Sequence, residues 1–88
     1  MKVMKFGAVW CSGCLIMKPR WEKIEKEWLW LETEYYDVDD NQEIVKRFNI
    51  NEYPCFIFLD KEGKEIERLY GEVAEEKLRA VIVKNKNK

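Results

Sequence analysis

Cysteine is the only residue type in this 88-residue chain that could act as a nucleophile or a soft-metal ligand near neutral pH. The sequence holds three cysteines and no histidine, which removes Ser-His and Cys-His nucleophile pairs and metal sites built on imidazole. Two cysteines, Cys11 and Cys14, are separated by two residues, whereas Cys55 is remote in the sequence. The expected chemistry is therefore thiol chemistry, either redox exchange or metal binding.

The Cys11–Cys14 pair lies where a predicted strand gives way to a predicted helix. This spacing on a first helical turn places both sulfurs on one face, near enough to close a disulfide. The free N–H groups and the dipole at a helix N-terminus stabilise a thiolate on the first cysteine. We therefore predict that Cys11 is the nucleophile, and that Cys14, one turn in and more buried, stays protonated until it resolves a mixed disulfide.

Other interpretations of the pair are open at this point. The two cysteines could be buried structural thiols or half of a zinc site, although zinc normally takes four Cys or His ligands and this chain offers three. The main alternative to redox chemistry is a binding module in which Cys11, Cys14 and Cys55 hold a metal or an Fe–S cluster, within one chain or at a dimer interface.

Four segments have the composition of strands. Residues 55–59 are wholly apolar, which predicts a central strand buried on both faces. Residues 64–70 are charged and follow a turn at residues 60–63, which predicts an edge strand. Two further strands are expected over residues 3–9 and 33–38.

Three helices are expected between and after these strands. Apolar residues recur on one face over residues 12–31, a helix that Pro19 should kink. A second helix is predicted to begin with Asp40 as its cap and Glu43 at the capping-box position, and a third follows Gly71. The order β-α-β-α-β-β-α predicts an α/β fold, a single mixed sheet with helices on both faces.

Length, charge and cysteine count limit the classes of function. One domain is expected over residues 1–84, and residues 85–88 are expected to form a disordered polar tail. The 16 basic and 17 acidic side chains give no basic footprint for nucleic acid. Residues 1–10 carry Lys5 and are too short for a signal peptide or a membrane span. Since an odd cysteine count does not fit a secreted disulfide framework, a cytoplasmic protein with no membrane partner is expected.

A series of short motifs runs through the chain: Trp10-Cys11-Ser12-Gly13-Cys14, Pro19, Asp37-Val38-Asp39, Tyr53-Pro54, Gly63 and Gly71. In this order and at this spacing they resemble thioredoxin-like proteins, over nearly the whole chain from about Lys2 to Ile82. The extra N-terminal strand and helix of full-length thioredoxins have no counterpart, so the resemblance implies a minimal thioredoxin-like fold.

The resemblance implies a small thiol-disulfide oxidoreductase in which Cys11 attacks and Cys14 resolves. Pro54 would be a cis-proline lying against the pair, and Trp10 and Tyr53 would complete the rim that docks substrates. No prosthetic group is expected, because the Cys11–Cys14 disulfide carries the redox equivalent. The expected partners are disulfide-containing proteins and an unidentified reductase as electron donor, and the expected state is a monomer.

Lys5 departs from the family pattern, because thioredoxins commonly carry at this position a buried aspartate that handles the proton of the resolving thiol. The lysine that normally faces that acid is replaced by Tyr35, so we do not carry the acid relay over. Lys5 could act as a base or stabilise a Cys14 thiolate. The interpretation favoured here is that Lys5 reaches the surface or pairs with a carboxylate such as Glu34 or Asp37.

Two further departures concern the sulfurs themselves. Ser12-Gly13 replaces the usual Gly-Pro between the cysteines, which by the family trend makes the disulfide more oxidising than that of a dedicated reductase. Cys55 replaces a threonine after the predicted cis-proline. We expect Cys55 to be a small buried hydrophobe, with disulfide exchange or a three-sulfur metal site as the alternatives.

Overall fold

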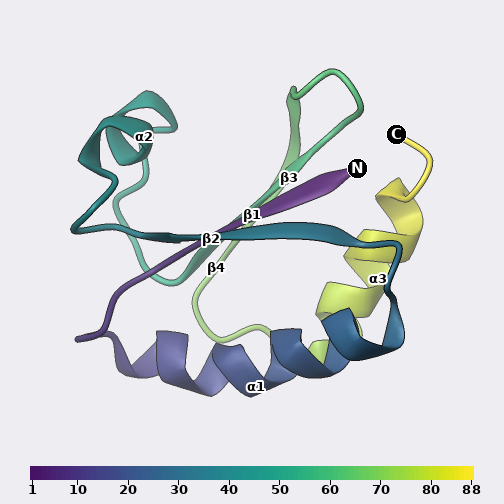
Figure 1. Cartoon of the computed structure of the whole chain (residues 1–88), viewed down its shortest axis with the longest axis horizontal. Helices are drawn as coiled ribbons and strands as arrows, with labels where there is room; N and C mark the ends of the chain where they lie inside the picture. The colour runs from purple at the N-terminus through teal and green to yellow at the C-terminus, as the bar shows by residue number, and fades with distance from the viewer.

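Four strands form one mixed sheet in the computed structural model, which describes residues 1–88 (Figure 1). The strand order is β2-β1-β3-β4, with β1 parallel to β2 and antiparallel to β3, and β3 antiparallel to β4. The central position of β3 and the edge position of β4 were predicted, and β1 is the second central strand. The strands are β1 (Lys2–Gly7), β2 (Glu32–Asp37), β3 (Cys55–Leu59) and β4 (Glu65–Tyr70).

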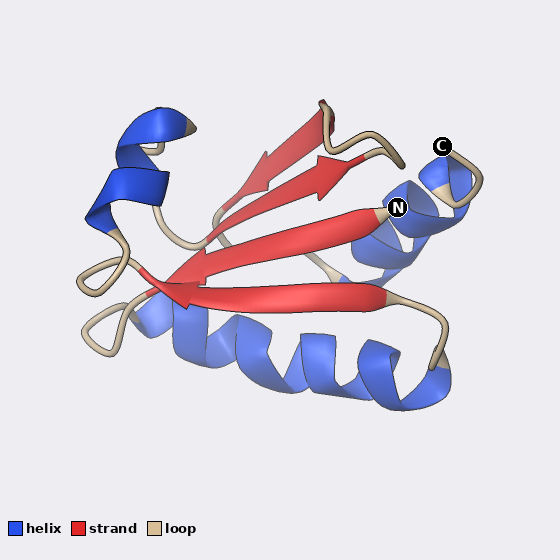
Figure 2. Cartoon of the chain, turned by 45° about the horizontal axis from the view of Figure 1, so that its top comes forward, coloured by secondary structure: helices blue, strands red, loops and turns tan.

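Helices cover both faces of the sheet, as predicted (Figure 2). The long helix α1 (Ser12–Glu27) and the last helix α3 (Glu75–Asn85) share one face, and the short α2 (Gln42–Arg47) lies on the other. Because side chains alternate along a strand, β3 contributes to two cores. Phe56 and Phe58 pack with α1 and α3, whereas Cys55, Ile57 and Leu59 pack toward α2.

Two helix ends differ from the sequence prediction. Helix α1 runs through Pro19 and ends at Glu27, where the N–H of the C-cap residue Trp28 still donates to the Ile24 carbonyl. Helix α2 begins at Gln42, so the predicted Asp40 cap is wrong. The N-cap is Asn41, and its side chain donates to the Asp37 carbonyl instead of capping the helix.

The C-terminal boundary predicted after Lys84 falls inside α3. Asn85 is the last residue of that helix and is buried, and its side-chain amide donates to the Val81 carbonyl at 2.9 Å. Asn85 therefore belongs to the folded domain, not to a tail. Beyond it, the Lys88 carbonyl accepts a hydrogen bond from the Lys61 N–H at 2.8 Å.

We predict that Phe58→Ala lowers the free energy of unfolding by about 3–5 kcal/mol, because Phe58 is fully buried beside Trp21 and its removal leaves a cavity. Urea unfolding monitored by circular dichroism measures the change. Val83→Ala is the control, because Val83 of α3 is 60% exposed. Its free energy of unfolding should stay within about 0.5 kcal/mol of that of the parent. Equal losses in the two variants would contradict this assignment of the core.

Candidate active site at the junction of β1 and α1

Cys11 is the N-cap residue of α1, and its sulfur provides the cap. The backbone is extended there, with φ −98° and ψ 112°, and Cys11 Sγ accepts a hydrogen bond from the Cys14 N–H at 3.2 Å. A helix N-terminus carries partial positive charge and N–H groups without partners inside the helix. A thiolate on Cys11 is therefore stabilised where the sulfur already lies.

The two thiols are free and differ in environment. Cys11 is the more buried by exposed area, at 8%, whereas Cys14 is half-buried, so the prediction that Cys14 is more buried was wrong. The reason is that Cys11 packs into the apolar cluster on the α2 side of the sheet. Burial, followed by a hydrogen bond with Cys11, nevertheless raises the pKa of the Cys14 thiol from 9.0 to about 11, so Cys14 is protonated at neutral pH.

The three residues predicted to form a rim come together around the cysteine pair. The Tyr53–Pro54 bond is cis, as predicted. A β-carbon placed on Gly13 would lie 3.1 Å from Pro54 Cδ, so the proline ring lies against the turn that joins the cysteines. Trp10 and Tyr53 meet edge to face, with ring centroids 6.0 Å apart.

Trp10 is held by a residue whose role the sequence reasoning missed. The indole is 62% exposed, and its Nε1 donates to Asp39 Oδ2 at 3.0 Å. Asp39 follows β2, the parallel neighbour of β1, and parallel strands end at the same edge of a sheet. The sequence signal for this contact was therefore the pair of carboxylates, Asp37 and Asp39, at the end of the second strand.

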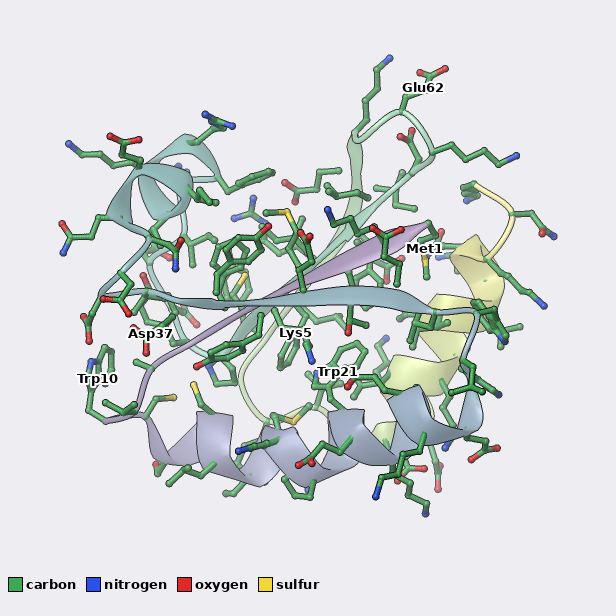
Figure 3. The ribbon with its side chains drawn as sticks, viewed as in Figure 1. Met1, Lys5, Trp10, Trp21, Asp37 and Glu62 are labelled. Atoms are coloured by element: carbon green, nitrogen blue, oxygen red, sulfur yellow. The ribbon has the colours of Figure 1, made fainter.

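Lys5 lies between the sheet and α1, as does Trp21 (Figure 3). Its ammonium pairs with Glu25 of α1 and lies 5.6 Å from the centroid of a Trp21 ring. Glu25 also accepts a hydrogen bond from the Thr33 hydroxyl at 2.9 Å. Lys5 thus has a carboxylate partner, as favoured from the sequence, but the partner is neither of the two residues suggested there. Glu34 instead pairs with Lys2 at 2.7 Å.

Cys55 is fully buried in β3 and belongs to the same apolar cluster as Cys11. Burial raises the pKa of the Cys55 thiol from 9.0 to about 11. No group of three or more His, Cys, Asp or Glu side chains is arranged to hold a metal ion. The structure therefore agrees with a small core hydrophobe and gives no support to a three-cysteine metal site.

A pocket of about 540 Å³ lies beside Cys14, between α1 and the sheet. It is lined by residues of β1, α1 and β2. It also reaches Pro54, which precedes β3, and Phe56, which lies in β3. The chemistry-bearing side chains on its wall are those of Lys5, Cys14, Lys18, Glu22, Tyr35 and Asp37.

Comparisons with known proteins agree with this fold. A family model described as Thioredoxin matches residues 1–84. The chain is 31% identical to "Thioredoxin H-type" of Fagopyrum esculentum over 81 residues, which is 92% of this chain and 69% of that protein. It is 33% identical to "Thioredoxin H2" of Arabidopsis thaliana over 78% of this chain, but spans only 51% of that relative's length.

Solved structures show the same similarity. The X-ray structure of Fasciola hepatica thioredoxin superposes with a TM-score of 0.87 at 36% identity, covering 96% of this chain and 79% of that one. The thioredoxin NaTrxh of Nicotiana alata gives 0.88 at 30% identity, covering 96% of this chain and 71% of that one.

A free dithiol at a helix N-terminus, with a cis-proline against it, defines a small thiol-disulfide oxidoreductase. The family match over residues 1–84 makes the assignment specific: the chain belongs to the thioredoxin family.

We predict that the stabilising contribution of Cys55 falls as the pH rises from about 9 to about 11. The raised pKa means that the unfolded chain loses the thiol proton in this interval while the folded protein keeps it. The parent should therefore exceed Cys55→Ala in stability by a constant amount at neutral pH and by a shrinking amount above pH 9. Urea unfolding of both proteins under reducing conditions measures this difference, and a difference independent of pH would contradict the prediction.

Proposed function

We propose that this oxidoreductase reduces or exchanges disulfides of protein substrates through Cys11 and Cys14, with no prosthetic group. The observation that carries the proposal is the position of Cys11 Sγ at the N-cap of α1, 3.2 Å from the Cys14 N–H. That contact keeps a nucleophilic sulfur and a protonated second thiol within one helical turn. Thioredoxins act on disulfide-containing proteins, and this chain shares their fold.

The proposed cycle has two exchange steps. In the first, the Cys11 thiolate attacks a substrate disulfide, a bond forms between Cys11 Sγ and one substrate sulfur, and the other substrate sulfur leaves and takes up a proton. In the second, Cys14 loses its proton and attacks Cys11 Sγ, which releases the remaining substrate thiol. The substrate gains two electrons, and the enzyme is left with a Cys11–Cys14 disulfide that a separate dithiol reductase must reduce.

Substrate docking is assigned to the rim of Trp10, Tyr53 and Pro54. The largely exposed indole of Trp10 offers an apolar contact surface, and its hydrogen bond to Asp39 fixes its orientation. The backbone of Tyr53 precedes the cis bond and would offer strand-like hydrogen bonds to an extended substrate segment. Lys5 and Cys55 are assigned no direct part in the exchange, since one is paired with Glu25 and the other is buried in the core.

The cellular setting belongs to the proposal as well. We place the protein in the cytoplasm as a monomeric electron carrier, because three cysteines, an odd number, do not fit the disulfide framework of a secreted protein. None of its helices has the length and apolar character needed to cross a membrane.

We predict that Cys14→Ser traps the protein on its substrate. The variant keeps the attacking Cys11 but lacks the thiol that resolves the mixed disulfide, so incubation with insulin should yield a covalent adduct that dithiothreitol releases. The parent should reduce insulin with dithiothreitol as electron donor, and Cys11→Ser should neither reduce nor form the adduct. Cys55→Ala is the matched control and should reduce insulin like the parent. An adduct formed by Cys11→Ser would reverse the assigned roles.

We also predict that the disulfide is more oxidising than that of a dedicated reductase, because Ser12-Gly13 replaces the proline-containing linker. Equilibration with glutathione buffers, followed by thiol titration, measures the potential. A potential as reducing as that of a typical thioredoxin would refute this prediction while leaving the exchange activity intact.

A further inference from the structure

The second step of the proposed cycle places a specific demand on Cys14. Its sulfur must carry negative charge as it attacks Cys11, although the burial of Cys14 and its hydrogen bond with Cys11 favour the protonated thiol. A hydrogen-bond donor aimed at this sulfur would stabilise the thiolate and speed the step.

The side chains of Cys14 and Tyr35 both pack against the backbone of Gly7. A β-carbon on Gly7 would lie 3.1 Å from Cys14 Sγ and also 3.1 Å from the Tyr35 hydroxyl oxygen. The sulfur and the phenol oxygen are therefore separated by no more than twice that distance. The only glycines with a left-handed backbone are Gly63 and Gly71, so Gly7 has no conformational need to be glycine. Its missing side chain is what lets the phenol approach the sulfur.

The sheet register brings Tyr35 to this position. Tyr35 pairs with Lys5 and Asp37 pairs with Gly7 across β1 and β2. Alternate residues of a strand share a face, and Lys5 contacts Glu25 of α1. All four of these residues therefore lie on the face of the sheet that α1 covers. Tyr35 is 58% exposed and its hydroxyl makes no hydrogen bond within the protein, whereas the hydroxyl of the next residue, Tyr36, donates to Glu34 at 2.6 Å.

The other polar groups near Cys14 are already engaged or face solvent. On β1, the Lys5 ammonium is paired with Glu25. On β2, Asp37 Oδ1 accepts a hydrogen bond from the Asp39 N–H at 2.9 Å.

On α1, the Glu22 carboxylate cannot donate, and Cys11 itself is the electrophile in the second step. Lys18 also lines the pocket and is exposed, as Tyr35 is, but no contact places its ammonium against Cys14, whereas the Tyr35 hydroxyl and Cys14 Sγ both lie against Gly7. Tyr35 is therefore the uncommitted donor that packs against the same backbone position as the sulfur. Burial, followed by the nearby charge of Asp37, raises the pKa of the Tyr35 phenol, which keeps the hydroxyl protonated and able to donate at neutral pH.

We propose that the Tyr35 hydroxyl donates a hydrogen bond to Cys14 Sγ as that thiol loses its proton, and so stabilises the thiolate that resolves the mixed disulfide. The thiol proton passes to water in the pocket and the Tyr35 O–H bond is retained. Cys14 Sγ bonds to Cys11 Sγ, and the bond between Cys11 Sγ and the substrate sulfur breaks. The inference rests on the proposed exchange function and assigns one side chain to its second step.

Tyr35→Phe tests the proposal, with Tyr36→Phe as the matched control on the opposite face of β2. An aromatic disulfide that releases a coloured thiolate serves as the substrate, because stopped-flow absorbance then separates two phases. The first phase reports attack by Cys11 and the second reports resolution by Cys14. We expect Tyr35→Phe to leave the first phase unchanged and to slow the second about tenfold, as for the loss of one hydrogen bond to a charged group.

A second readout does not depend on any substrate. Titration of thiolate absorbance in the ultraviolet should show a higher pKa for Cys14 in Tyr35→Phe than in the parent. The common background is Cys11→Ser/Cys55→Ala, because the Cys55 thiol would otherwise titrate in the same range as Cys14. Tyr36→Phe should match the parent in both measurements. A second phase and a Cys14 pKa that do not change in Tyr35→Phe would overturn the proposal, as would equal slowing by Tyr36→Phe. Absence of the first phase in the parent would instead overturn the proposed function.

Gly7→Ala tests whether the space between the two side chains matters. The added carbon should push the phenol away from Cys14 and slow the second phase by itself. If Gly7 acts through Tyr35, the double variant Gly7→Ala/Tyr35→Phe should be no slower than the slower single variant. Additive losses would show that the new carbon acts on Cys14 directly, and would overturn the role given to Gly7.

Discussion

The chemistry of this protein depends on one contact, the capping of α1 by the sulfur of Cys11. The cap forms only if β1 delivers Cys11 to the first turn of a well-anchored helix. β1 is fixed as a central strand between β2 and β3, and α1 is fixed by the buried face that includes Met17, Trp21 and Ile24. Both partners of the junction are therefore rigid, so the free N–H groups that favour a thiolate are in place before any substrate arrives.

The chemistry of the site follows from an asymmetry between its two sulfurs. Cys11 has the helix terminus as a local source of positive potential, whereas burial together with a hydrogen bond with Cys11 raises the pKa of the Cys14 thiol. Beneath them, Lys5 forms an ion pair with Glu25, and Glu25 also accepts a hydrogen bond from the Thr33 hydroxyl. The Lys5–Glu25 ion pair thus joins α1 to the sheet. The Tyr35 hydroxyl lies near Cys14 and has no hydrogen-bond partner within the protein.

Local sequence patterns were sufficient for the order of elements, because apolar periodicity reflects which face of each element is buried. They were also sufficient for the turn at Gly63 and the edge position of β4. They failed at the start of α2, where Asn41 and not Asp40 is the N-cap residue, and where the Asn41 side chain donates to the Asp37 carbonyl instead of capping the helix. They also failed at Asn85, whose burial depends on contacts with Val81 and with Glu67 across the fold.

The sequence by itself determined the kind of chemistry: a Cys-x-x-Cys pair at a strand-to-helix transition and no histidine. These features are local, and the physics of a helix terminus acts on them within a single turn. Only the tertiary structure decided that Cys11 is more buried than Cys14 and that Lys5 pairs with Glu25. It also decided that Tyr35 and Cys14 pack against the same backbone position, Gly7. Each of these depends on how α1 packs against the sheet, which brings together residues far apart in the chain.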